Sequence, residues 1–375
     1  MNNQNKGKKV LMIGPFPDPI TGMSLANKML LNGLRRDGHK VDIIDSDTEK
    51  KLTSLNAQGK FKLKKVLNSI KPIVKGCYKI IFGNYDVIYI TPAQSYLGFM
   101  KFTPFINMAM IRKVKCYLHF HGGFVRQMYD SVSSKKQLKL KKYFERSNGI
   151  IVLGHSLKYM FTDILDESKV FVCENGIENS MIISKDELKN KIENVNFDKK
   201  IEVLYLSNLM KTKGIIELLQ SFIRFKNDNI NIHLDLAGSI ETDIEEEVKG
   251  LLKELGEYVT YHGVVKGETK KNLLKKDSVF CLPTYYPNEG QPISILEAMG
   301  NGLAIVTTDQ GGIKDIFKNG VNGEYCLKED EKSIYKAILR VTEKYNIYAL
   351  NNYEECINYY TENKFTQRVQ EIIFK

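Results

Sequence analysis

The chain has 375 residues, of which 43% are hydrophobic and 26% are charged, and its formal net charge is +11. This length and composition predict a globular protein of two ordinary domains and exclude a disordered or fibrous one. The six cysteines are scattered and form no Cys-x-x-Cys pair, which argues against a structural zinc site or a dithiol redox site.

The first nine residues are polar and basic, and they lack the apolar core of a secretory signal. We therefore expect a cytoplasmic protein. The most apolar stretch, 96–111, contains Lys101 and Pro104 and is shorter than the roughly twenty apolar residues that span a bilayer. We interpret this stretch as a buried helix.

In the first half of the chain, strand-like apolar runs alternate with segments of helical periodicity. A helix at 24–37 begins at an N-cap Ser24 and lies between the first two strands, which is the start of a βαβ unit. The pattern therefore predicts a mostly parallel sheet covered by helices. Its strands are expected at 9–14, 41–45, 86–91, 114–120, 150–153 and 170–173.

The segment 60–79 contains seven lysines and no acidic residue, and apolar residues alternate loosely with the lysines. An amphipathic segment on an anionic lipid surface has this pattern, and so does an ordinary solvated lysine face over core, and we weigh the two equally. The first reading would place the protein on the inner face of the plasma membrane. No nucleic-acid-binding motif accompanies the charge, so we expect no nucleic acid partner.

The apolar periodicity lapses between 175 and 200, and a second alternation of strands and helices follows. We expect an N-terminal domain at 1–180, a linker at 181–200, a C-terminal domain at 201–355 and a helix at 356–375 that returns to the N-terminal domain. The second set of strands is expected at 202–207, 230–237, 258–263, 279–283 and 303–307. The helices of this half are expected at 214–226, 243–255, 267–275 and 292–300.

Both halves thus have the pattern of a doubly wound, Rossmann-like α/β domain. In such sheets, ligands bind beyond the carboxyl ends of the strands, so two facing domains of this kind would form a cleft between them. We therefore look for functional residues in the loops that lead from a strand to a helix.

The loop after strand 279–283 leads into a helix that begins at a proline. Pro292 suits a first helical turn, because its fixed φ is helical and its missing N–H is not needed there. The free N–H groups near Ile293 and Ser294 and the helix dipole make a site for a diphosphate, which Gly290 leaves open to approach. Gln291 lies in the same loop.

Two glutamates separated by seven residues bracket this helix start. Glu297, one turn into the helix, can accept hydrogen bonds from a ribose diol, and Glu289 can face a sugar instead. This arrangement suits a ligand that has a sugar at each end of its diphosphate. Most isolated glutamates are simply exposed charges, and the surrounding residues decide against that interpretation here.

The loop after strand 202–207 carries Lys213 directly before Gly214 and a helix. A lysine in this place can neutralise a diphosphate leaving group, although a surface lysine in a turn is the ordinary alternative. In the first half, strand 114–120 leads into His121, Gly122 and Gly123. The glycines allow a ligand to approach the backbone, and the histidine can bind a sugar hydroxyl.

Two further patterns have metal-binding interpretations that we do not adopt. The nearby His119 would supply a second imidazole beside His121, but no third ligand is visible. The Asp-x-Asp pattern at 45–47 has no further acids placed to complete a cation site. We expect no metal and no other cofactor.

The segments 289–299, 302–308 and 311–313 closely resemble retaining GT-B glycosyltransferases of family 4, and the likeness extends over nearly the whole chain, least in 45–84. The resemblance implies that Glu297 holds the donor ribose, that Glu289 contacts the donor sugar and that His121 is the N-terminal domain's histidine. It also implies that Gly22 belongs to a flexible loop over donor and acceptor, and that the reaction retains configuration without a metal.

The sequence departs from the family at two loops. Thr21-Gly22 stands where a double glycine is usual, and Ser207-Asn208 stands where the family has Gly-Arg. Asparagine cannot form the bidentate phosphate contact of arginine, so Lys211 is a candidate to supply the missing charge.

The sequence therefore predicts a glycosyltransferase that moves a sugar from a nucleotide sugar, with a UDP-sugar favoured, to a glycan, lipid-linked or polysaccharide-precursor acceptor. A nucleotide-sugar epimerase or phosphorylase on the same fold, and a sugar-nucleotide-binding protein with weak catalysis, are the alternatives.

Overall fold

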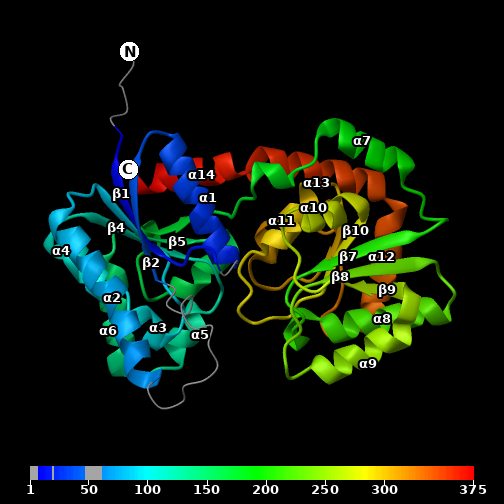
Figure 1. Ribbon diagram of the computed structural model, residues 1–375, viewed down its shortest axis with the longest axis horizontal. Coiled ribbons are helices and arrows are strands. Elements are labelled where there is room, and N and C mark those ends of the chain that lie inside the picture. Colours follow the sequence, from blue (N-terminus) through cyan, green and yellow to red (C-terminus); the bar gives the residue numbers. More distant parts are fainter. Residues whose placement is uncertain (1–6, 19–20, 47–60) are drawn as a thin grey trace. The chain divides into compact units, whose positions relative to one another are not determined.

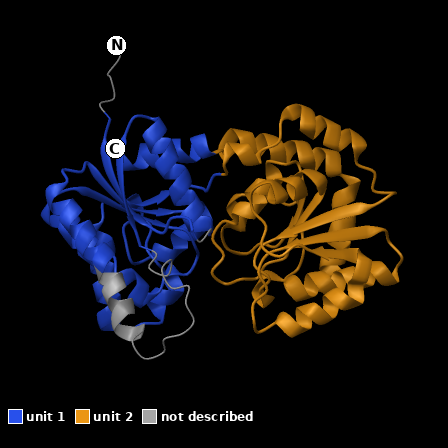
Figure 2. Cartoon of the chain, viewed as in Figure 1, with its two compact units in different colours: residues 1–176, 362–375 blue, residues 177–361 orange. Residues whose placement is uncertain are grey.

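The computed structural model of the chain describes residues 7–18, 21–46 and 61–375, with side chains in these ranges except at 61–70. The chain divides into two compact units (Figure 2). Unit 1 contains Met1–Gly176 together with Glu362–Lys375, and unit 2 contains Ile177–Thr361. Each unit is described by itself.

Unit 1 is built around one parallel sheet with the strand order β2-β1-β3-β4-β5-β6 (Figure 1). Its strands are β1 (Lys9–Gly14), β2 (Lys40–Asp45), β3 (Val87–Ile90), β4 (Lys115–Phe120), β5 (Gly149–Val152) and β6 (Val170–Val172). Its helices are α1 (Gly22–Arg36), α2 (Phe61–Phe82), α3 (Tyr96–Met100), α4 (Thr103–Ile111), α5 (Val125–Asp130), α6 (Ser134–Arg146) and α14 (Glu362–Ile373).

Alternate residues of the central strands of unit 1 face different helices. Leu11 and Ile13 of β1 belong to a buried cluster with residues of α4 and α6, whereas Val10 and Met12 pack with residues of α1 and α14. This is the period-two alternation of a strand that is buried on both faces. The sheet is therefore covered by helices on both sides.

Two helix starts in unit 1 differ from the prediction. Helix α1 begins two residues earlier than expected, because the Thr21 side chain accepts from the backbone N–H of Ser24 and the Ser24 side chain accepts from that of Thr21. The predicted single helix at 96–111 is interrupted, and α4 begins at Thr103 with Pro104 in its first turn. A proline is accommodated there, because the N–H that it lacks has no acceptor in a first turn.

Unit 2 contains a second parallel sheet, with the strand order β12-β11-β10-β7-β8-β9. Its strands are β7 (Ile201–Leu206), β8 (Ile232–Ala237), β9 (Val259–Tyr261), β10 (Val279–Leu282), β11 (Ala304–Thr307) and β12 (Gly323–Tyr325). Its helices are α7 (Lys185–Asn194), α8 (Ile215–Asn227), α9 (Glu245–Leu255), α10 (Gly267–Lys276), α11 (Ile293–Met299), α12 (Glu331–Glu343) and α13 (Tyr345–Tyr359).

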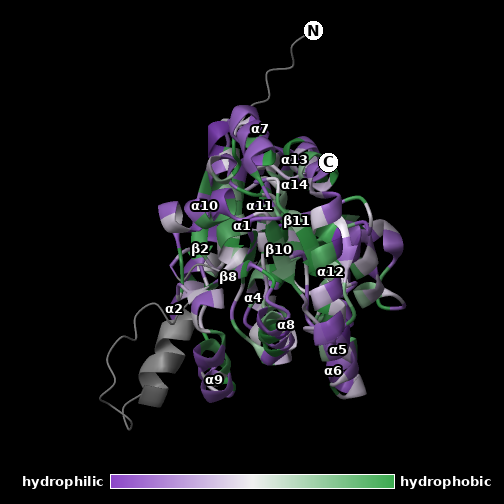
Figure 3. Ribbon diagram, turned by 90° about the vertical axis from the view of Figure 1, so that its right-hand side faces the viewer, coloured by the Kyte–Doolittle hydropathy of each residue, from purple (hydrophilic) through white to green (hydrophobic). Residues whose placement is uncertain are grey.

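Helices cover both faces of the unit 2 sheet, with α8 and α9 on one side and α10, α11 and α13 on the other (Figure 1). The strands β10 and β11 are hydrophobic, whereas α6 in unit 1 is mainly hydrophilic (Figure 3). The prediction of two doubly wound parallel sheets is confirmed. The three-residue strand β12 had no counterpart in the sequence-based prediction, because it is too short to show a period.

The boundaries of the two units differ from the domain boundaries that we expected from the sequence. The segment 181–200, expected as a linker, contains α7 and belongs to unit 2. A capping box between Ser184 and Glu187 starts this helix, and its Leu188 is buried with Ile183 and Tyr353. The helix that joins unit 1 is α14, which begins at Glu362 rather than at 356 and packs on α1.

The contact between α1 and α14 can be tested by a single methyl group. A Cβ at Gly33 would lie 2.2 Å from the Thr366 hydroxyl oxygen, whereas one at the helical Gly250 of α9 would meet nothing within 4 Å. We expect Gly33→Ala to lower the free energy of unfolding by about 1–3 kcal/mol through overpacking. Gly250→Ala should instead stabilise the protein by up to about 1 kcal/mol. Urea denaturation of both variants measures the difference, and equal effects would contradict the packing.

Candidate functional site

Two loops of unit 2 are joined at the carboxyl ends of the neighbouring strands β7 and β10. The backbone N–H of Tyr285 donates to the Thr212 carbonyl oxygen at 2.8 Å. Gly214 has φ +73°, and a Cβ there would lie 2.2 Å from the carbonyl oxygen of Pro283. Because only glycine permits both this conformation and this approach, the sequence fixes the loop of Lys213 against the loop of Glu289.

The joined loops hold a buried ion pair. The Lys213 ammonium lies 2.6 Å from an oxygen of Glu289, and their side chains are 13% and 7% exposed. The same carboxylate oxygen accepts from the Thr284 hydroxyl at 2.9 Å, and the ammonium lies 5.1 Å from the centre of the Tyr286 ring. A buried carboxylate of this kind is stable only because it has these partners.

Two glycines in the loop after β11 pack against the backbone of the loop that carries Glu289. Gly311 has φ +54°, and a Cβ there would lie 2.2 Å from the carbonyl oxygen of Glu289. The N–H of Gly312 donates to the carbonyl oxygen of Gly290 at 2.9 Å. The loop that follows β11 therefore packs directly on the backbone that carries Glu289.

The second glutamate has a lysine of its own. Glu297 lies in α11 with its side chain 4% exposed, and one of its oxygens is 2.6 Å from the ammonium of Lys270 in α10. Burial raises the pKa of Glu297, and Lys270 opposes that rise. The sequence analysis did not identify Lys270, because nothing in the local sequence distinguishes it from the other lysines of α10.

The predicted start of helix α11 is displaced by one residue. Pro292 is the N-cap with ψ 116°, so the helix begins at Ile293 and not at Pro292. Gly290 and Gln291 are buried in the preceding loop, and residues 292–294 are partly exposed. The two glutamates thus bracket the helix start, as their spacing predicted.

Asn208 and Lys211 lie apart from the two ion pairs. Both residues are exposed, and the Asn208 side-chain oxygen accepts from the Ser239 hydroxyl at 3.0 Å. The Asn208 carbonyl accepts from the Tyr205 hydroxyl, also at 3.0 Å. The structure places neither of them in contact with Glu289 or Glu297, so Lys213 and Lys270 are the lysines at this site.

In unit 1, the end of β4 brings two imidazoles together. The rings of His119 and His121 are 4.2 Å apart, and the Tyr89 hydroxyl lies 2.6 Å from Nδ1 of His119. Burial lowers the pKa of both histidines, that of His121 to about 4 although the Asn175 side chain opposes the shift. Both side chains are therefore neutral at pH 7.

The three glycines predicted for the site in unit 1 lie either in a buried loop or at the start of a helix. Gly122 and Gly123 are buried, and a Cβ at Gly122 would lie 2.5 Å from the Gln94 side-chain nitrogen. Gly22 is the first residue of α1. The backbone at Gly122 therefore lies close to Gln94, and the approach of a ligand to Gly122 and Gly123 stays a prediction.

The Asp-x-Asp pattern falls partly outside the described residues. Asp45 ends β2, and its carboxylate accepts from the backbone N–H of Phe16 at 3.4 Å, whereas Asp47 is not described. Among the residues that the structure describes, no three His, Cys, Asp or Glu side chains gather as a metal site would require.

Comparisons with known proteins agree on one class. Residues 186–362 match a family model described as glycosyl transferases group 1. An uncharacterized glycosyltransferase of Methanocaldococcus jannaschii is 25% identical over 358 residues, 90% of this chain and 89% of that protein. The capsular polysaccharide biosynthesis glycosyltransferase CapM of Staphylococcus aureus is 29% identical over 201 residues, 50% of each chain.

A solved structure shares the fold over both units. HepE of Anabaena, crystallised in complex with UDP-glucose, superposes with a TM-score of 0.71 and 17% identity over 97% of this chain and 98% of that one. The segment matched by the family model contains Lys213, Lys270, Glu289 and Glu297.

The Lys270–Glu297 pair gives a prediction for stability. Lys270→Met would leave the Glu297 carboxylate buried without its cation, so its pKa should rise further. We expect a loss of about 3–5 kcal/mol of unfolding free energy at pH 8, and a smaller loss at pH 5, because the carboxyl group then binds a proton.

The matched control is Lys271→Met, because Lys271 pairs with the mostly exposed Glu268 at 3.0 Å and contributes little. Chemical denaturation at both pH values measures the losses. A loss in Lys270→Met that is independent of pH, or equal to that of the control, would show that the pair does not hold Glu297.

Proposed function

Because the chain is a glycosyltransferase with the two-domain GT-B fold, we propose that unit 2 holds a nucleoside-diphosphate sugar, with UDP as the favoured nucleotide. The observation that carries this proposal is the pair of buried Glu–Lys contacts beside the start of α11. The presence of UDP-glucose in HepE, which has the same fold, supports the choice of nucleotide.

Lys213 stabilises the leaving group in this proposal. When the bond between the anomeric carbon and the donor phosphate oxygen breaks, negative charge develops on the diphosphate, and a positioned ammonium lowers the energy of that state. In the structure the Lys213 ammonium is held by Glu289, so the diphosphate must take over this contact. The N–H groups of Ile293 and Ser294 add donors at the helix start.

The carboxylates hold the two sugars of the donor. Glu297 accepts hydrogen bonds from the ribose diol, and Glu289 accepts from hydroxyls of the transferred sugar, with Gly290 and Gln291 in the loop between them and the helix. Asn208 contributes no charge to the leaving group. Lys211 is exposed at the start of the same 3₁₀ turn as Lys213, and it is the residue that can supply a second positive charge to the leaving group.

The acceptor in this proposal is a glycan, a lipid-linked sugar or a polysaccharide precursor, and the relation to CapM supports this class. The neutral imidazole of His121 provides a hydrogen-bonding group for a sugar hydroxyl, and Gly122 and Gly123 carry no side chain that would keep a ligand from the backbone beside it. We also propose that configuration is retained by attack on the face that the leaving group departs from, without a metal ion.

Transfer assays with a panel of nucleotide sugars and acceptors test this proposal. Lys213→Met and Glu297→Gln should each lower kcat/KM about 10²-fold or more, because each removes a charged contact to the donor. Product that forms only with acceptor present separates transfer from epimerisation. Lys249→Met, on the exposed face of α9, is the control, and wild-type rates in both site variants would overturn the assignment.

The exposed side chains of α2 suggest a place where the enzyme could meet a membrane-bound acceptor. Val74, Tyr78 and Phe82 lie at successive helical turns and are 61%, 63% and 66% exposed. Lys71 and Lys75 are exposed on the same helix. Apolar side chains beside cations suit the surface of an anionic membrane, and we propose that unit 1 binds one there. The earlier part of the basic segment, 60–70, lies outside the described side chains.

Within the part of the chain that the structure describes, no helix is both long enough and apolar enough to cross a membrane.

Vesicle sedimentation at low salt tests the membrane proposal. The double variant Tyr78→Ser/Phe82→Ser should bind phosphatidylglycerol vesicles at least about tenfold more weakly than the wild type, because two aromatic side chains no longer enter the interface. Leu138→Ser is the matched control, since Leu138 is equally exposed on the different helix α6. Equal binding by wild type and double variant, or equal binding to phosphatidylcholine vesicles, would exclude α2 as the contact.

A further inference from the structure

Unit 2 contains a pocket at the opposite end of its sheet from Lys213 and Glu289. It lies near the amino ends of β7 and β10, where it is lined by α7, by the segment 195–200 and by the end of α10. Its volume of about 580 Å³ is in the range of small-molecule sites. The proposed donor site does not use any of these residues.

The lining of this pocket is strongly basic. Positive side chains exceed negative ones by three, because five lysines and only Glu187 and Glu202 line it. Three asparagines add amide groups at the same surface. The lysines of the lining are Lys191, Lys199, Lys200, Lys275 and Lys276.

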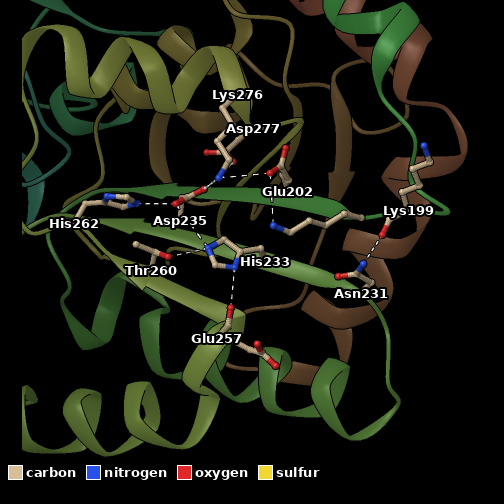
Figure 4. A network of polar contacts seen from close by, with 11 residues as sticks. Lys199, Glu202, Asn231, His233, Asp235, Glu257, Thr260, His262, Lys276 and Asp277 are labelled. Atoms are coloured by element: carbon tan, nitrogen blue, oxygen red, sulfur yellow. Dashed lines mark hydrogen bonds and ion pairs between the residues drawn. The ribbon is translucent and has the colours of Figure 1, made fainter.

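Three of the five lysines already have carboxylate partners. Lys275 pairs with Glu187 at 2.7 Å. Lys276 lies 2.5 Å from Asp235 and 3.5 Å from Glu202, and the ammonium of Lys200 lies 3.8 Å from Glu202 (Figure 4). These contacts account for the negative charges of the lining and leave two lysines uncompensated.

Lys191 is the first of these two. Lys191 is half-buried, and its ammonium donates to the carbonyl oxygens of Leu274 and Asn301, both at 2.9 Å. Among the described residues no carboxylate lies within 4 Å of it, and burial lowers the pKa of Lys191 to about 7 although Asp277 and Glu202 oppose the shift. An anion in the pocket would supply the charge that the protein does not.

Lys199 is the second lysine of the lining that has no carboxylate partner. Its backbone oxygen accepts from the Asn231 side chain, while its ammonium extends away from that contact (Figure 4). No ion pair to Lys199 is found within the described residues. Lys191 and Lys199 therefore border one pocket without a carboxylate partner, and Lys191 is half-buried whereas Lys199 is exposed.

We propose that this pocket binds a phosphorylated small molecule, whose phosphate oxygens contact Lys199 and lie close to the charge of Lys191. Phosphate fits better than a carboxylate, because it carries more charge and more acceptor oxygens for several lysines and amides at once. A neutral ligand would leave the excess of positive charge without a partner. The volume of about 580 Å³ suits a small molecule.

The pocket is connected to the proposed donor site through Lys191. Leu274, one of its two acceptors, lies one helical turn after Lys270 in α10. Asn301, the other, donates through its side chain to the carbonyl oxygen of Glu297 at 2.8 Å. Lys191 thus contacts α10, which carries Lys270, and Asn301, which follows the helix that carries Glu297.

Inorganic pyrophosphate is the probe, titrated by calorimetry into the full chain at constant ionic strength. The chain is first used as Lys213→Met, so that binding at the proposed donor site does not mask the pocket. We expect one pyrophosphate site to remain in this variant. Adding Lys199→Gln and Lys200→Gln should weaken that site at least about tenfold, because charge-assisted hydrogen bonds are lost.

The matched control adds Lys185→Gln and Lys189→Gln, which remove the same charge from α7 outside the pocket and should leave the affinity unchanged. Lys191→Met, checked by thermal unfolding, should also abolish the site. The proposal is overturned if Lys213→Met binds no pyrophosphate, or if pocket and control substitutions weaken binding equally. Either result leaves the donor proposal intact, because transfer activity is measured separately.

Discussion

Two carboxylates kept inside unit 2 by lysines from other elements are the interaction on which the site depends. Glu289 and Glu297 are both nearly buried, and an isolated buried carboxylate would take up a proton or destabilise the fold. Lys213 and Lys270 lie against these carboxylates and compensate their charge. Each glutamate can then accept hydrogen bonds from a hydroxyl of a ligand. Each ammonium can exchange its contact with the glutamate for a contact with an incoming anion.

The sheet order explains how the four side chains come together. Strand β10 lies between β7 and β11, so the loop after β10 meets the loop after β7 on one side and the loop after β11 on the other. Glycines make both approaches possible, since Gly214 and Gly311 each adopt a positive φ against a carbonyl oxygen of the central loop. Helix α10, which precedes β10, brings Lys270 to Glu297. The site is thus a consequence of parallel topology and close backbone contact.

Much of this could be predicted from the sequence, because apolar periodicity records which residues a strand or helix buries. The alternation located eleven of the strands, and the residues around Pro292 located the helix start between the two glutamates. Lys270 could not be found this way, since its partner is 27 positions away and is chosen by the packing of α10. Helix α7 was overlooked although Ser184 and Glu187 form a capping box, because its charged surface suggested a linker.

The central claim is that a nucleotide sugar replaces the protein's own contacts at Lys213 and Glu297. A crystal structure of the chain with UDP bound tests it most directly. The account predicts the diphosphate on Lys213, released from Glu289, and the ribose hydroxyls on the Glu297 carboxylate. UDP bound elsewhere, with both Glu–Lys pairs unchanged, would contradict it.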